Sequence, residues 1–304
     1  MRALCGGSIA LVTASYTRSY RSILALKMST IANNINSEER GNNNHLLRNH
    51  LKRLQSSPSE ALILDGGTGE ELFLRGVPDD RKIWSAKAIV DAQYHSILEE
   101  VHNSFIDAGS HAITTNSYGI TPGVGFVDGE EVKRLVAISG QIARRVVTKT
   151  SSSNPTASNP TALVLGSLGP LVESYRPDLI MKHDDGVKAY QFLIEGLYPN
   201  IDIYLAETMS CLDEACQAVD AISKFYNGNQ NQVHIKHPLL VSFTLNSEGQ
   251  SKKGEPVIEV IPKLIQYAHE KKVECEFLHC FIHGTLSFPF IILIRSFHSV
   301  YENL

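Results

Sequence analysis

The chain of 304 residues lacks the features that mark several specialised classes of protein. It has no apolar run near the ~20 residues that a membrane helix needs; the longest candidate, residues 288–294, contains Pro289 and is followed by Arg295. Neither sign of charge dominates, with 28 Lys and Arg against 32 Asp and Glu, which argues against a protein built to bind nucleic acid or an anionic membrane. Five cysteines are too few for a disulfide scaffold, and their odd number leaves at least one thiol unpaired or otherwise used.

Acidic residues are missing from the first 37 positions, where three Arg and one Lys stand among many serines and threonines. This composition is typical of an organellar transit peptide; the alternative is an unselected leader with Met28 as the true start. We therefore expect a cytoplasmic protein, or an organellar one if residues 1–37 act as a transit peptide. We expect three parts: a leader with a disordered segment at 1–59, a folded domain at 60–280 and an atypical tail at 281–304.

Apolar runs alternate with amphipathic segments through the middle of the chain. Short apolar runs predict buried strands at 61–65, 112–115, 162–168, 201–206, 239–245 and 273–278. Helical spacing predicts helices at 94–108, 130–148, 186–198, 211–225 and 257–271. Gly109 is expected to end the first of these helices, and Pro262 is expected in the first turn of the last.

Six consecutive strand–helix units with nearly continuous apolar strands predict a parallel sheet covered by helices. No G-x-G-x-x-G follows any strand, so a dinucleotide-binding doubly wound sheet has no support. Polar residues recur where the predicted strands end, at Asp65, Asn116, Ser167, Glu207, Thr244 and Cys280. Barrel enzymes place their chemistry on that face. The pattern favours a (β/α)8 TIM-type barrel that is incomplete, since six units are two short of closure.

Several of these strand ends combine groups that suit a polar ligand, although each has a structural alternative. Asp65 precedes two glycines, which let a ligand approach the backbone closely or form a turn. Residues 113–118 place five hydrogen-bonding side chains at one strand end, and such groups need partners. Glu207 directly follows an apolar strand, so its carboxylate needs a ligand ammonium or a structural cation. Cys280 is a candidate soft metal ligand or a small buried apolar residue.

In this order the motifs resemble the homocysteine S-methyltransferase family. The segments that support the resemblance are LDGGTGEEL (64–72), WSA (84–86), ITTNSY with ITP after it (113–122), LGSLGP (165–170), SYRPD (174–178), AETMSCLDEA (206–215) and SFTL (242–245). The family fold is a (β/α)8 barrel, in agreement with the alternation of strands and helices.

The resemblance implies a zinc ion, held by three cysteines, that binds the homocysteine sulfur. Cys280 matches the first of these ligands. The other two lie in a Gly-Gly-Cys-Cys segment of the family, and the 304 residues contain no such segment, so the zinc site is expected to be incomplete. The family also implies the substrate-binding residues. Asp65 and Glu207 would bind the homocysteine ammonium, the backbone of Gly66 and Gly67 would line the site, and Thr115, Asn116 and Tyr118 would border the methyl donor.

The expected function is transfer of a methyl group from a sulfonium or betaine-type donor to the zinc-activated thiol of homocysteine, which forms methionine. The expected partners are therefore two small molecules, with no nucleic acid and no membrane. The alternative is a homocysteine- or amino-acid-binding module without catalysis, or an inactive fragment, because two zinc ligands are missing. The tail after residue 280 is expected to be either out-of-frame sequence in a truncated product or the end of a shortened homologue.

Overall fold

The computed structural model describes residues 62–153, 162–229, 235–278 and 294–295. All of them belong to one compact unit, 41–295. The α-helices are α3 (Thr68–Leu74), α4 (Lys87–Val90), α5 (His95–Asp107), α6 (Gly129–Ser153), α7 (His183–Leu197), α8 (Leu212–Gly228) and α9 (Val257–Glu270). The strands are β1 (Ala112–Thr114), β2 (Leu163–Leu168), β3 (Ile203–Met209), β4 (Leu239–Phe243), β5 (Cys275–Leu278) and β6 (Ile294–Arg295). Short 3-10 helices are η1 (Trp84–Ala86), η2 (Ala92–Tyr94), η3 (Pro122–Val124) and η4 (Tyr198–Asn200).

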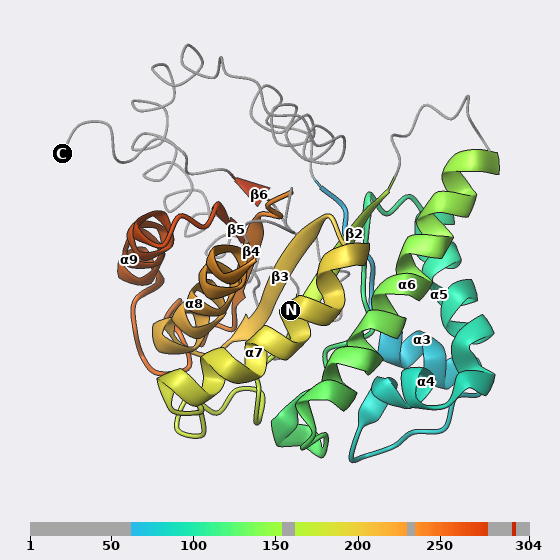
Figure 1. Cartoon of the computed structure of the whole chain (residues 1–304), viewed down its shortest axis with the longest axis horizontal. Helices are drawn as coiled ribbons and strands as arrows, with labels where there is room; N and C mark the ends of the chain where they lie inside the picture. The colour runs from blue at the N-terminus through green and yellow to red at the C-terminus, as the bar shows by residue number, and fades with distance from the viewer. Residues whose placement is uncertain (1–61, 154–161, 230–234, 279–293, 296–304) are drawn as a thin grey trace, which may run out of the picture. The chain divides into compact units, whose positions relative to one another are not determined.

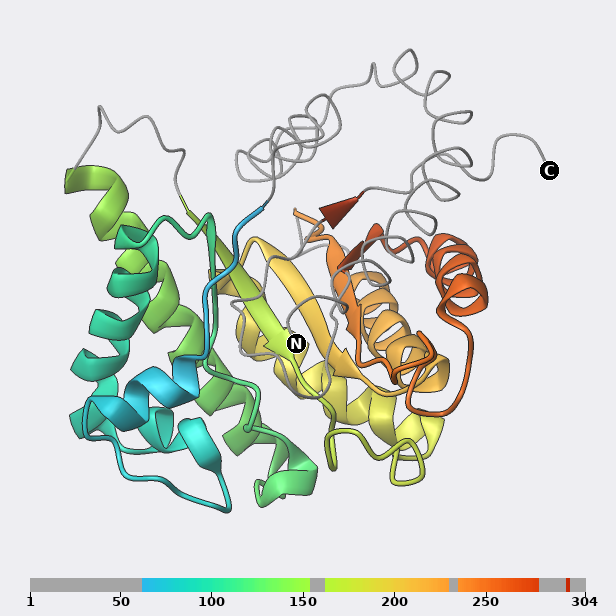
Figure 2. The same cartoon turned by 180° about the vertical axis from the view of Figure 1, so that it is seen from behind.

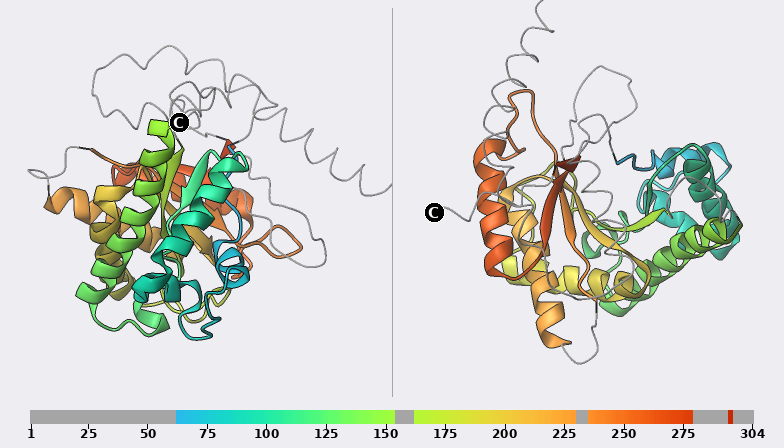
Figure 3. Two further views of the ribbon diagram at one scale, coloured as in Figure 1. Left: turned by 90° about the vertical axis from the view of Figure 1, so that its right-hand side faces the viewer. Right: turned by 90° about the horizontal axis from the view of Figure 1, so that it is seen from above.

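The sheet follows the order of the sequence, β1-β2-β3-β4-β5-β6, and each neighbouring pair from β1 to β5 is parallel. Helices α6 to α9 lie in front of the strands in Figure 1. From behind, the sheet is in view with no described helix across it (Figure 2), and the view from above shows these helices along the outer side of the curved sheet (Figure 3). Sequential parallel strands with helices on one face are the arrangement of a barrel, whereas a doubly wound sheet reverses its strand order and is covered on both faces.

Both faces of the sheet are apolar, because successive strand residues point to opposite sides. Val164, Tyr204 and Val241 belong to the main hydrophobic cluster that the helices share. Their neighbours face the other way and form a second cluster, which comprises Leu62, Ala112, Leu163, Leu165, Ile203, Leu205 and Leu240. Every residue of β2 and β4 is buried. The expectation of strands buried on both faces is therefore confirmed for the described sheet.

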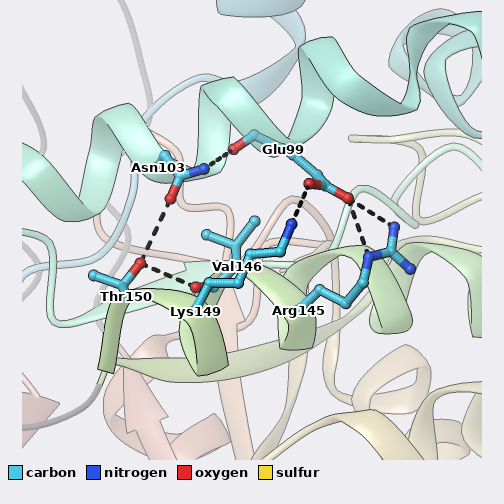
Figure 4. A network of polar contacts seen from close by, with 6 residues as sticks. All are labelled: Glu99, Asn103, Arg145, Val146, Lys149 and Thr150. Atoms are coloured by element: carbon cyan, nitrogen blue, oxygen red, sulfur yellow. Dashed lines mark hydrogen bonds and ion pairs between the residues drawn. The ribbon is translucent and has the colours of Figure 1, made fainter. Parts of the chain in front are cut away.

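The five helices predicted from apolar periodicity are all present as α5 to α9, with ends that differ by a few residues. Gly109 follows α5 with a φ of +102°, as its expected place at the helix end requires. On the outer surface, Glu99 of α5 accepts hydrogen bonds from Arg145 and Lys149 of α6, and Asn103 and Thr150 meet beside them (Figure 4). Such exposed pairs each stabilise a fold by less than ~1 kcal/mol, so buried apolar contacts dominate this packing.

The first predicted strand, 61–65, is not a strand in the described segment that begins at Leu62. The segment runs beside β1, but side chains take several of the bonds that a backbone ladder would make. The Ile63 N–H donates to the His111 imidazole, and the Ser110 hydroxyl donates to the Leu64 carbonyl. The Thr114 N–H donates to the side chain of Asp65. The expected burial is also wrong for most of this run, since Leu62 is buried but Ile63 is 50% exposed, and the apolar pattern could not show this exchange of hydrogen-bond partners.

The parallel part of the described sheet has five strands and not six, because residues 62–65 do not form one. The last predicted strand, 273–278, is present as β5, and β6 pairs with it in the antiparallel sense. The expectation for Pro262 is wrong, since it lies inside α9 and not in its first turn. Proline there removes the N–H that would bond to the carbonyl of Ile258. The helix continues because Val260, Leu264 and Ala268 bury one face of it.

The leader at 1–59 and nearly all of the tail after 280 lie outside the described residues, so the expected transit peptide and both domain boundaries stay predictions. None of the helices that the structure describes has the length and hydrophobicity to cross a membrane.

The contact between α6 and α7 gives a test of this packing. A Cβ atom on Gly196 of α7 would lie 2.4 Å from both the Lys133 carbonyl oxygen and a methyl carbon of Val136 on α6. We expect Gly196→Ala to lower the free energy of unfolding by about 1–3 kcal/mol, because the helices must move apart. Gly228→Ala at the end of α8 is the matched control, since its Cβ would meet no atom within 4 Å. Urea unfolding of both variants measures the difference, and equal stabilities would contradict the close approach.

Candidate functional site

A cavity of about 300 Å³ opens at the carboxyl end of the sheet. Its lining comes from the segment after Leu62, from η1, from the ends of β1, β3 and β4, and from the loop after β1. The lining residues are Leu64, Asp65, Gly66, Thr68, Gly69, Ser85, Thr114, Thr115, Asn116, Tyr118, Leu205, Glu207 and Ser242. Residues from five separate parts of the chain therefore meet at the face where a barrel enzyme binds its substrate.

The two-residue period of the strands explains which side chains reach this cavity. The second apolar cluster occupies alternate positions along β1 to β4. On each of these strands, the residue two positions after the last member of the cluster is polar and points to the same side of the sheet. These positions are Thr114 after Ala112, Ser167 after Leu165, Glu207 after Leu205 and Ser242 after Leu240. One apolar face thus ends in a layer of polar side chains at its carboxyl edge.

The pairing of β3 with β4 is irregular at the level of this layer. Ala206 pairs with Val241, and Met209 pairs with Phe243. Two residues of β3, Glu207 and Thr208, therefore lie opposite Ser242 alone, which is a β-bulge. Thr208 has a φ of +64°, a conformation that costs a β-branched residue about 1–3 kcal/mol. Bulges and strained residues of this kind concentrate at functional sites.

Asp65 is fixed by a single neighbour. The Thr114 N–H donates to Oδ2 at 2.7 Å and the Thr114 hydroxyl donates to Oδ1 at 2.7 Å. Burial raises the pKa of Asp65 to about 6, although both hydrogen bonds act in the opposite direction. The next residue, Gly66, packs against Phe105, whose ring carbon would lie 2.9 Å from a Cβ on Gly66. A larger residue there would push the carboxyl group away from Thr114.

Glu207 is the second carboxyl group of the cavity. The Ser167 hydroxyl donates to its Oε1 at 2.5 Å. Burial and, to a smaller extent, the charge of Asp65 together raise the pKa of Glu207 to about 7, although the hydrogen bond from Ser167 acts in the opposite direction. Within the described residues no Arg or Lys acts on either carboxyl group. When ionised, the two carboxyl groups are negatively charged hydrogen-bond acceptors. A cationic partner for them has to come from a ligand or from residues outside the described ones.

The other side of the cavity is aromatic. The rings of Trp84 and Tyr118 stack with centroids 6.3 Å apart. The Tyr118 hydroxyl lies 2.6 Å from the Ser174 hydroxyl, and burial raises the pKa of Tyr118 to about 12. The Asn116 amide donates to the Ser85 carbonyl at 2.7 Å, which ties the loop after β1 to η1. Trp84 lies at the start of η1 and stacks on Tyr118 from outside the lining.

Thr115 connects the polar layer to β2. Its Oγ1 accepts a hydrogen bond from the Ser167 N–H at 3.0 Å and lies 2.8 Å from the Ser117 hydroxyl, which donates to the Ser167 carbonyl. These hydrogen bonds give a structural role to several of the closely spaced hydroxyl groups at 113–118. The Thr115 hydroxyl is thus already bonded to other groups of the protein.

Comparison with known proteins decides the family. Residues 62–281 match the family model for homocysteine S-methyltransferase. The chain belongs to this family. It is 28% identical over 235 residues to the homocysteine S-methyltransferase of Escherichia coli (strain K12), a match that covers 72% of this chain and 70% of that protein. Homocysteine S-methyltransferase YbgG of Bacillus subtilis (strain 168) is 26% identical over 176 residues, which cover 54% of this chain and 55% of the relative.

Solved structures agree with this assignment. The homocysteine methyltransferase MmuM from Escherichia coli, in its metallated form, matches with a TM-score of 0.59 and 26% identity over 72% of this chain and 74% of that chain. Its oxidized form matches equally well, with a TM-score of 0.59 and 27% identity. The chain thus spans about three quarters of these structures and about half of the Bacillus subtilis relative.

The cavity of this homocysteine S-methyltransferase homologue contains most of the residues expected at the substrate site. Those in the lining are Asp65, Gly66, Thr115, Asn116, Tyr118 and Glu207. Gly67 is not among the lining residues, and Cys280 lies outside the described ones. Ser85 and Ser242 also line the cavity. Both lie in motifs named above, WSA and SFTL, but neither was among the expected site residues, although the two-residue period from Leu240 places Ser242 on the cavity side.

A zinc site does not form within the part of the chain that the structure describes, where no three His, Cys, Asp or Glu side chains gather around one point. Cys211 and Cys216 are present there as free thiols, Cys211 buried and Cys216 partly buried. Burial raises the pKa of Cys216 to about 12, the opposite of what a metal-binding thiolate needs. The described residues therefore do not fit a zinc ion.

The raised pKa of Glu207 predicts how stability changes with pH. The pKa is about 7 in the folded chain against 4.5 for the free side chain, so the folded state binds this proton more tightly. That contribution to stability is present below pH 4.5 and is lost as the pH rises to about 7. Glu207→Gln keeps the shape without the charge, and we expect it to raise the free energy of unfolding at pH 8 by about 2 kcal/mol.

Urea unfolding at pH 5 and pH 8 measures this effect. At pH 5, where Glu207 is largely protonated in the folded chain, the difference between Glu207→Gln and the original chain should nearly vanish. Glu100→Gln, on the exposed side of α5, is the control and should change stability little at either pH. A variant that is less stable at pH 8 would show that the ionised carboxylate supports the fold.

Proposed function

We propose that this chain binds homocysteine in the cavity and that its site serves methyl transfer from a sulfonium or betaine-type donor to the homocysteine sulfur, which forms methionine. One observation supports the proposal above the others. Two carboxyl groups, Asp65 and Glu207, share a cavity in which the described residues provide no cation to pair with them. An α-ammonium group would supply that charge, and membership of the family supports homocysteine as the amino acid that bears it.

Binding of the ammonium would change the protonation of the site. An opposite charge next to a carboxyl group lowers its pKa. The pKa values of about 6 and about 7 for Asp65 and Glu207 would fall, and the ionised forms would each accept a hydrogen bond from the ammonium. The backbone of Gly66 and Gly67, next to Asp65, would approach the amino acid closely because neither residue has a side chain.

The methyl donor would lie on the side of Thr115, Asn116 and Tyr118. A sulfonium or quaternary ammonium group bears positive charge, and the faces of aromatic rings attract such cations. Tyr118 provides such a ring in the lining, with Trp84 stacked on it from outside, and the contact between the hydroxyls of Tyr118 and Ser174 fixes its position. In the transfer, the sulfur of homocysteine forms the new bond to the methyl carbon as the donor's bond to that carbon breaks. The donor leaves without its charge, and the thiol proton is released.

Activation of the thiol is the step for which the described residues supply no group. The relative MmuM has been solved in a metallated form, and zinc activation is the family expectation. In this chain Cys280 is the residue that matches a zinc ligand, and it lies outside the described part. The strands from β1 to β5 are proposed to be the early strands of a (β/α)8 barrel.

A second function has an observation in its favour. The 304 residues contain no Gly-Gly-Cys-Cys segment, so a homocysteine-binding module without catalysis is the alternative. Incubation of the full chain with homocysteine, S-methylmethionine and zinc separates the two, with methionine measured by mass spectrometry. Methionine formation that Cys280→Ser abolishes supports the enzyme; homocysteine binding without methionine supports the module. Neither binding nor turnover would contradict both functions.

Glu207→Ala tests the proposed binding mode. At pH 8 Glu207 is ionised, and loss of a charge-assisted hydrogen bond to the ammonium should weaken homocysteine binding at least about tenfold. Isothermal titration calorimetry measures the affinity, with Glu100→Ala on the outer surface of α5 as the control. Equal affinities of Glu207→Ala and the control would mean that the carboxylate has a structural role only.

A further inference from the structure

Ser242 has a property that sets it apart from the other hydroxyl groups of the cavity. Its side chain is 1% exposed, it lines the cavity, and its Oγ has no hydrogen-bond partner within the described residues. Buried hydroxyl groups almost always have a partner. The neighbouring hydroxyls follow that rule: Ser167 donates to Glu207 and Thr114 donates to Asp65. Ser242 is thus a buried donor that points at a ligand space with its bond unmade.

Its position relative to the carboxyl groups is fixed by the sheet. Ser242 alone faces the bulge that contains Glu207 and Thr208, since the flanking pairs are Ala206 with Val241 and Met209 with Phe243. Side chains directly across neighbouring strands lie about 5 Å apart. The nitrogen and a carboxylate oxygen of an α-amino acid are three bonds apart, so a ligand whose ammonium is bound to Glu207 can reach Ser242 with its carboxylate.

The charge of the cavity decides which ligand atom this is. Asp65 and Glu207 attract the ammonium of an amino acid, and the carboxylate of the same ligand is attached to the same carbon. The described lining contains no Arg, Lys or His side chain to receive that carboxylate. It has to be met by neutral donors, and among the buried hydroxyls of the lining Ser242 is the one still free to donate.

We propose that the Ser242 hydroxyl donates a hydrogen bond to the α-carboxylate of the amino-acid substrate and so selects ligands that bear both head groups. The inference rests on the proposed binding of homocysteine. In the free protein this hydroxyl makes no hydrogen bond to a described residue, and it gains one when the substrate binds.

Two ligands and two variants test the assignment by isothermal titration calorimetry at pH 8. Ser242→Ala should bind homocysteine about tenfold more weakly, as expected for a lost hydrogen bond to a charged group. It should bind 3-aminopropane-1-thiol, which lacks the carboxylate, as the original chain does. Ser139→Ala on α6 is the matched control, because Ser139 is also fully buried and unpartnered among the described residues but does not line the cavity. It should leave both affinities unchanged.

Thermal unfolding without ligand gives an independent readout. Ser242→Ala and Ser139→Ala should each unfold at the same or a higher temperature than the original chain, because each removes a buried hydroxyl that has no partner. A less stable Ser242→Ala, or equal homocysteine affinity of Ser242→Ala and the original chain, would overturn the assignment. Equal weakening for both ligands would overturn the contact with the carboxylate. Failure of the original chain to bind homocysteine would instead refute the proposed function, and the role of Ser242 with it.

Discussion

Side chains along the five parallel strands point alternately to the two faces of the sheet, and the rest of this structure depends on that constraint. Because helices cover one face, the residues of one phase pack against them, and those of the other phase form a second apolar cluster. The polar residues that remain can lie only where the strands end. Chain order then brings these ends together along one edge, so a site assembles from segments that are more than a hundred residues apart in the sequence, such as Asp65 and Glu207.

The local geometry at that edge departs from regular structure in two places. Asp65 gives its side chain to the Thr114 N–H where a first strand would use its backbone. The bulge in β3 places Glu207 and Thr208 against one residue of β4. Both departures direct a carboxyl group at the cavity and away from water, and burial then raises both pKa values. The fold thus maintains two poorly solvated carboxyl groups next to an unpaired hydroxyl, an arrangement that an amino-acid ligand would stabilise.

The helices and the parallel strands were predictable because their signals are long and local. Amphipathic periods predicted α5 to α9, and apolar runs predicted β1 to β5. The strand predicted at 61–65 was wrong, because side chains such as those of His111 and Asp65 make hydrogen bonds there that a backbone ladder would otherwise make. Pro262 was misplaced, since its tolerance inside α9 depends on the buried face of that helix.

The site was predictable in its residue types but less so in its pairings. The ordered motifs selected six residues that line the cavity, Asp65 and Glu207 among them. The expected site residues also included Gly67, which does not line the cavity, and left out Ser242, although the motif SFTL (242–245) contains it and its phase relative to Leu240 places it on the cavity side. The contacts of Glu207 with Ser167 and of Asp65 with Thr114 join residues 40 and 49 positions apart, and no local pattern encodes such pairs.

In the proposed binding mode, two partly buried carboxyl groups, Asp65 and Glu207, exchange their protons for the ammonium of an amino acid. Proton release on homocysteine binding measures this exchange most directly, by calorimetry at pH 6.5 in buffers of different ionisation enthalpy. With pKa values of about 6 and about 7 in the free chain, ionisation on binding should release a substantial fraction of one proton. The observed enthalpy would then vary with the buffer, and Glu207→Gln would reduce that variation. Binding with the same enthalpy in every buffer would contradict the account.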